Sequence, residues 1–154
     1  MISKRTEHND DRERERIVYG TEVDWDSASG GLKRIGPLSE HLDTGIGTDQ
    51  LARLIQKGYV DPEDTQNGGP RMEKLLEFGD WVEDNFDTEN ITVRYTGYMI
   101  SVDRPDSRVT ITGIRIIYSD ELTVPVKLEN EFIGEFRRAD EFERTDEYMR
   151  AWWD

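Results

Sequence analysis

Carboxylates are the main candidates for chemistry in this sequence, because the chain has no cysteine and only two histidines. Without cysteine, a thiolate nucleophile, a disulfide and a Cys-based zinc or iron–sulfur site are all excluded. His8 lies in a highly charged N-terminal stretch, far from His41, so the sequence indicates no histidine triad, zinc site or proton shuttle. A carboxylate pair, as in glycosidases, stays formally open, but nothing singles out a pair among the 34 acidic residues.

A loop rich in oxygen ligands begins at Asp61. Asp61, Glu63 and Asp64 supply the carboxylate oxygens that Ca²⁺ and Mg²⁺ prefer in proteins. Their spacing differs from that of an EF-hand loop, and a chain this acidic brings carboxylates together in many segments. We therefore expect hydrated surface and no bound metal here, with a divalent-cation site in the 61–67 loop as the alternative.

The string DTGIGT at residues 43–48 resembles the Asp-x-Gly-x-Gly box of the histidine-kinase and gyrase-type ATPases. That resemblance implies that Asp43 reads the adenine amino group, while Gly45 and Gly47 let the loop approach a nucleotide. Three parts of the family's pattern are missing: an apolar strand before Asp43, room for the metal-binding Asn helix, and a second glycine-rich phosphate loop. We therefore expect a glycine turn that leads into a helix cap, with nucleotide binding as the alternative.

The first three residues of the same string are also similar to the Asp-Thr-Gly motif of aspartic proteases, in which two carboxylates share a proton. In those enzymes the aspartate lies in an apolar strand. The residues before Asp43, SEHL at 39–42, do not form such a strand pattern. The match is three residues long, and we do not build a protease on it.

The charge balance bounds the environment and the partners. The formal net charge is -14, and arginine outnumbers lysine three to one. An acidic, lysine-poor surface suits concentrated salt, where the Debye length falls to a few ångströms, so we predict a halophilic organism or its virus and a loss of stability at low salt. The same charge argues against duplex DNA or RNA and against anionic membranes as partners. With neither a transmembrane stretch nor a secretory signal, we expect a cytoplasmic protein of a high-salt cell or a virion component.

The chain divides into a charged polyampholyte tail, residues 1–16, and a single α+β domain, residues 17–154. The tail is almost wholly polar and cannot fold alone, yet it carries a quarter of the basic residues. Alternating apolar residues predict a strand from Ile17 to Trp25, and the stretch that follows is irregular to about Gly47. Thr48 suits the cap of a short helix that ends near Gly58, and Pro70 suits the first position of a second helix.

A long hairpin is predicted next, from strands at 91–102 and 108–118. Gly97 and Gly113 each lie where the apolar residues change parity, which is typical of a β-bulge. A strand that is apolar on both faces is the alternative. If Val102 opposes Val109, the two glycines fall almost opposite each other and the hairpin bends there.

The C-terminal quarter is predicted as a strand followed by a helix. Alternation over 122–128 indicates a strand, which Pro125 places at an edge, and residues 132–136 extend the meander. Asp140 and Glu143 resemble a capping box that opens a C-terminal helix. The fold class is therefore α+β, with a mostly antiparallel meander of four or five strands, two central helices and a C-terminal helix.

For function, these observations favour a non-catalytic interaction or assembly subunit with protein partners and no cofactor. A homo-oligomer, or a larger assembly such as a virion neck or tail, fits this expectation. Trp152 and Trp153 either close the domain's own core or anchor a partner. The alternative is a nucleotide- or divalent-metal-dependent enzyme that uses the 43–48 or 61–67 loop. The candidate interaction residues are Arg12, Arg14, Arg16, Trp152 and Trp153.

Overall fold

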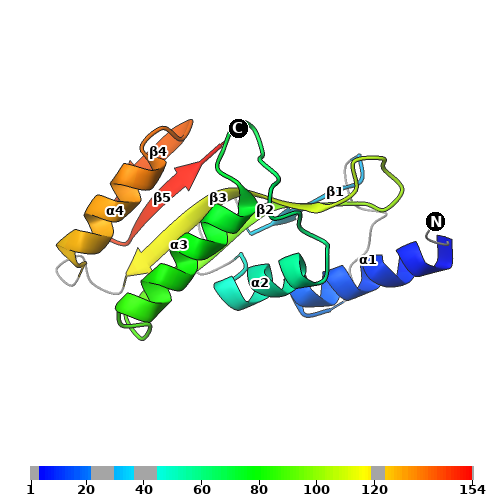
Figure 1. Cartoon of the computed structure of the whole chain (residues 1–154), viewed down its shortest axis with the longest axis horizontal. Coiled ribbons are helices and arrows are strands. Elements are labelled where there is room, and N and C mark those ends of the chain that lie inside the picture. Colours follow the sequence, from blue (N-terminus) through cyan, green and yellow to red (C-terminus); the bar gives the residue numbers. More distant parts are fainter. Residues whose placement is uncertain (1–3, 22–29, 37–44, 119–123, 154) are drawn as a thin grey trace.

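The computed structural model describes residues 4–21, 30–36, 45–118 and 124–153, and side chains from residue 12 onwards (Figure 1). In these residues, four helices accompany a five-stranded antiparallel sheet of order β1-β2-β3-β5-β4. The predicted α+β class is confirmed. The elements are α1 (Lys4–Tyr19), β1 (Leu32–Ile35), α2 (Thr48–Gln56), α3 (Met72–Asn85), β2 (Ile91–Ile100), β3 (Val109–Tyr118), α4 (Val126–Phe136), β4 (Glu141–Arg144) and β5 (Tyr148–Trp152).

The predicted hairpin forms from β2 and β3, which lie in the middle of the sheet between β1 and β5. Its register runs from Ile91 opposite Tyr118 to Met99 opposite Val109. Val109 therefore pairs with Met99 and not, as the sequence had suggested, with Val102. The connecting segment includes the predicted 103–107 turn. α2 and α3 supply the two predicted central helices, although Gly47 caps α2 in place of Thr48. α3 begins at Met72 with Arg71 as its cap, two residues after Pro70, which was expected at its first position.

A β-bulge lies at the predicted glycines, but its extra residue belongs to β3. Thr96 pairs with Gly113 and Gly97 pairs with Ile111, so the register skips Thr112. Ile111 and Ile114 can therefore both face the core, which confirms the predicted parity change in β3. β2 keeps one parity throughout, with alternate residues from 91 to 99 buried. The predicted change in β2 is wrong because one extra residue shifts only the strand that contains it.

The C-terminal strand and helix were predicted in the wrong order. Pro125 is the N-cap of α4, and Leu128, Phe132 and Phe136 lie on the buried face of that helix. Proline has a fixed φ and no N–H group, so it suits a helix start as well as a strand edge. Residues 141–152 form the β4–β5 hairpin where a helix was predicted. Met149 and Ala151 are buried there with a period of two, as a strand requires.

The N-terminal region also differs from the prediction. α1 runs through Ile17 and Tyr19, which were expected in a strand, and the rest of that expected strand from residue 22 lies outside the described residues. The Gln50 side chain donates a hydrogen bond to the Ile17 carbonyl (2.8 Å) and thereby joins α1 to α2. The helix extends across the boundary expected between residues 16 and 17. β1 lies in a stretch that was expected to be irregular.

The helices α2, α3 and α4 cover one face of the sheet, and the main core lies between these two layers (Figure 1). Aromatic rings fill the centre, where Phe78, Phe132 and Phe136 form edge-on contacts at 5.0–5.9 Å. Tyr95 reaches from β2 into the helical layer and donates a hydrogen bond to the Leu75 carbonyl (2.6 Å). Within the described residues, every helix is too short or too polar to span a lipid bilayer.

Candidate functional site

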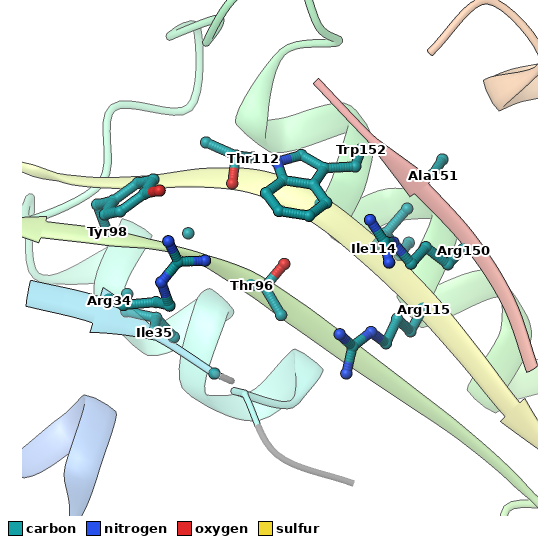
Figure 2. A pocket seen from close by; sticks show the side chains of 13 residues that line it. Arg34, Ile35, Thr96, Tyr98, Thr112, Ile114, Arg115, Arg150, Ala151 and Trp152 are labelled. Carbon is teal, nitrogen blue, oxygen red and sulfur yellow. The ribbon is translucent and has the colours of Figure 1, made fainter. Parts of the chain in front are cut away.

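The sheet face opposite the helices carries a group of arginines and aromatic side chains, of which Figure 2 shows the central part. These side chains come from β1, β2, β3 and β5, and they surround a shallow hollow that Thr96 and Thr112 also line. Alternation along the strands explains the arrangement, because residues between core positions must point to the other face. We call this surface the arginine face and define it as Arg34, Arg115, Arg150, Tyr98 and Trp152.

Three arginines form a row across neighbouring strands. Arg94 of β2 lies directly opposite Arg115 of β3, which in turn lies opposite Arg150 of β5. Like charges opposite each other destabilise a sheet, so this row is a local electrostatic cost in an otherwise acidic protein. Burial lowers the pKa of Arg115, whose exposed fraction is 5%, and repulsion from Arg150 lowers it further. Arg115 and Arg150 therefore bring two positive charges together beside the hollow, while the Arg94 guanidinium lies near Gly47 at the edge of β2.

Two arginines stack on aromatic rings at the sides of the hollow. The Arg34 guanidinium lies over the Tyr98 ring at 5.5 Å, and the Arg150 guanidinium lies over the Trp152 ring at 4.6 Å (Figure 2). Stacking of this kind restricts the guanidinium orientation and keeps its N–H groups at the surface. Among the described residues, no carboxylate forms an ion pair with Arg34, which is exposed.

Carboxylates border the arginine face on the β4 side. Glu141 forms an ion pair with Arg150 (2.9 Å), and Glu143 lies opposite Arg150 in the β4–β5 register. The Tyr148 hydroxyl donates a hydrogen bond to Glu143, and this bond is the main reason that the pKa of Tyr148 is raised. The charge of Arg150 is therefore compensated by carboxylates at the β4 border of the face, whereas Arg34 lies on the other side of the hollow, away from these carboxylates.

The two terminal tryptophans have different environments. Trp153 is buried, with an exposed fraction of 6%, and its ring lies 5.8 Å from Phe136 in the core. Trp152, the last residue of β5, points to the opposite side and belongs to the arginine face (Figure 2). Trp153 therefore closes the domain's own core, and a partner-anchoring role for Trp152 stays a prediction.

Comparisons with family models, curated proteins and solved structures found no match to this chain.

The glycines of the 43–48 loop have a structural explanation. Asp43 lies outside the described residues. Gly45 has φ +106°, and a Cβ atom there would lie 2.5 Å from the Tyr95 carbonyl oxygen, because Ile46 pairs with Tyr95 at the edge of β2. Gly47 caps α2, and its N–H donates to the Gln50 side chain (2.9 Å). This geometry is the glycine turn and helix cap that the sequence predicts.

The 61–67 loop uses its carboxylates within the fold. Asp64 forms an ion pair with Arg108 (2.9 Å), and Asp61 accepts a hydrogen bond from the Glu63 N–H (2.9 Å). The Arg108 guanidinium also donates to the Gln66 side chain (2.6 Å), which ties the loop to the start of β3. In the ranges that the structure describes, no group of three or more His, Cys, Asp or Glu side chains could hold a metal ion.

The candidate arginines of the tail lie on α1, away from the arginine face. Arg14 is buried, with an exposed fraction of 3%, and donates a hydrogen bond to the Ile100 carbonyl (2.8 Å). Arg16 is exposed and Arg12 is half-buried. The sequence thus predicts Trp152 as an interaction residue, but Arg34, Arg115 and Arg150 beside it were not among the predicted residues. Their signal was the alternation of Arg94, Thr96 and Tyr98 between core positions, which marks one face of a strand.

Proposed function

We propose that this chain is a non-catalytic interaction subunit that binds protein through its arginine face. The partners are further copies of the chain or other members of a larger assembly, such as a virion neck or tail. The working environment is the concentrated salt of a halophilic cell or of its virus, and no cofactor takes part. The observation that carries the proposal is the pairing of Arg115 with Arg150, together with the Arg34–Tyr98 and Arg150–Trp152 stacks, on the sheet face that the helices leave uncovered.

The composition of this face supports protein binding. Tryptophan, tyrosine and arginine are the residues most enriched at the energetic centres of protein interfaces. Arginine is also less strongly hydrated than lysine and binds carboxylates through two parallel hydrogen bonds, so its contacts persist where salt screens longer-range attraction. The nucleotide and metal alternatives gain no comparable observation from the described residues, because Gly45, Gly47 and Asp64 already serve the fold.

The proposal is tested by light scattering coupled to size exclusion in multimolar KCl. We expect the wild-type chain to form a defined oligomer, or to bind a protein in its native lysate, and Trp152→Ala with Arg34→Ala to abolish that association. Arg138→Ala is the matched control, because Arg138 is an exposed arginine beyond the end of α4. A wild-type chain that is strictly monomeric and retains no protein from its native lysate overturns the proposal.

A further inference from the structure

A second charged surface lies on the helical side of the molecule. Asp49 at the start of α2 and three carboxylates near the end of α3 are all exposed. The pKa of Asp80 is raised, first by partial burial and then by repulsion from its acidic neighbours. In the part of the chain that the structure describes, no ion pair joins a cation to any of these carboxylates. We call this surface the acidic patch and define it as Asp49, Asp80, Glu83 and Asp84.

The acidic patch and the arginine face lie on opposite sides of the sheet. α2 and α3 cover one face of the sheet (Figure 1), and the arginine face is the other (Figure 2). The two surfaces therefore cannot neutralise each other within one molecule. The acidic patch supplies carboxylates and the arginine face supplies guanidinium groups, and carboxylates are the preferred partners of stacked guanidinium groups.

We propose that the arginine face of one copy binds the acidic patch of a second copy, head to tail. This inference rests on the proposed function and specifies its partner as the same chain. Because the contact joins two different surfaces, each bound copy still exposes one free arginine face and one free acidic patch. Repetition of the contact builds a closed ring when the rotation closes, or an open filament when it does not.

Concentrated salt is compatible with this contact. Two copies that each carry a net charge of -14 repel strongly in dilute buffer, and this repulsion is largely removed when the Debye length falls to about 3 Å in 1 M salt. Direct arginine–carboxylate pairs act over a comparable distance and are screened less once they are partly buried. High salt therefore removes the barrier to association while the contact itself persists.

Two complementary variants test the head-to-tail geometry. The first, Arg34→Gln with Arg150→Gln, removes charge from the arginine face and leaves the acidic patch intact. The second, Asp80→Asn with Glu83→Gln and Asp84→Asn, does the reverse. Light scattering in multimolar KCl should show each variant alone as a monomer. Their equimolar mixture should form a dimer and nothing larger, because only one functional contact is possible per pair.

Several outcomes overturn this inference. If either variant alone keeps the wild-type oligomer size, or if the mixture stays monomeric beside an oligomeric wild type, the contact lies elsewhere and only the proposed function survives. A wild-type chain that remains monomeric and binds no protein overturns both the head-to-tail contact and the proposed function. A fluorescent single-stranded oligonucleotide that binds wild type and not the first variant identifies nucleic acid as the partner instead. Circular dichroism confirms folding, and Arg34→Gln alone replaces the first variant if Arg150→Gln impairs it.

Discussion

Gly79 illustrates how a single residue is fixed by its tertiary neighbours. Glycine inside a helix costs about 1 kcal/mol relative to alanine, so its place in the middle of α3 is locally unfavourable. A Cβ atom at residue 79 would overlap the Tyr95 hydroxyl and approach the Thr48 methyl group to 2.5 Å. Tyr95 cannot move away easily, because it is fully buried and its hydroxyl is bonded to Leu75. The close packing of α3 on β2 thus requires glycine.

Gly79→Ala and Gly134→Ala should therefore change stability in opposite directions. We expect Gly79→Ala to lower the free energy of unfolding by about 1–3 kcal/mol, the usual cost of overpacking a core. Gly134 lies in α4 with open space where its Cβ would be, so Gly134→Ala should raise that free energy by up to about 1 kcal/mol. Denaturant unfolding at one fixed salt concentration measures both. A stabilising Gly79→Ala would show that α3 does not pack on Tyr95 as described.

At the scale of elements, α4 shows how one apolar pattern fits two structures. The alternation around Pro125 was short, and Leu128 ended the expected strand. The same Leu128 starts a spacing of four that continues through Phe132 and Phe136, which is the period of a helix. The helix buries all three side chains against α3 and the sheet. Residues four apart would also share one face of a strand, so the spacing alone does not decide. Packing against the rest of the core therefore decides between the two periods.

Truncation of Phe132 tests the position of α4. Phe132 is fully buried and contacts the rings of Phe78 and Phe136, so Phe132→Ala should lower the free energy of unfolding by about 3–5 kcal/mol. Val126 opens the same helix with an exposed fraction of 73%, so Val126→Ala is the control and should change stability by less than about 0.5 kcal/mol. Thermal and denaturant unfolding measure the difference. If Phe132→Ala lowered the free energy of unfolding as little as Val126→Ala does, the Phe132 side chain would lie outside the core.

At the scale of the whole molecule, unbalanced charge sets the response to salt. Acidic residues exceed basic ones by 34 to 20, so self-repulsion opposes the compact state in dilute buffer. The acidic patch brings four carboxylates together on the helical side, and the pKa of Asp80 there is raised first by partial burial and then by repulsion from its acidic neighbours. The arginine face concentrates the opposite charge on the other side of the sheet.

The midpoint of thermal unfolding should therefore rise with KCl concentration. Screening weakens repulsion in the folded state, so stability should be lowest in dilute buffer and should increase over the molar range. Asp80→Asn with Glu83→Gln and Asp84→Asn removes part of the repulsion and should make the salt dependence shallower. A midpoint that is independent of KCl, or that falls as KCl is added, would contradict both this explanation and the prediction of a halophilic source.

The sequence by itself determined the α+β class, the β2–β3 hairpin and the two central helices. Each of these depends on a local period or on a local signal. Leu51 and Leu54 repeat at helical spacing, and Gly97 and Gly113 mark the bulge. The sequence also predicted that the DTGIGT string is a turn into a helix cap. Local backbone preference is strong where one period extends over a whole element.

Only the tertiary structure decided the C-terminal third and the candidate site. The arginine row exists because β5 inserts between β3 and β4, and no local pattern specifies which strands become neighbours. The separation of Trp152 from Trp153 likewise depends on β5 being a strand, since adjacent residues point to opposite faces only there. Both features follow from the burial of Met149, Ala151 and Trp153 against the helical layer. The stabilisation that this burial provides comes from contacts between segments that are far apart in the sequence.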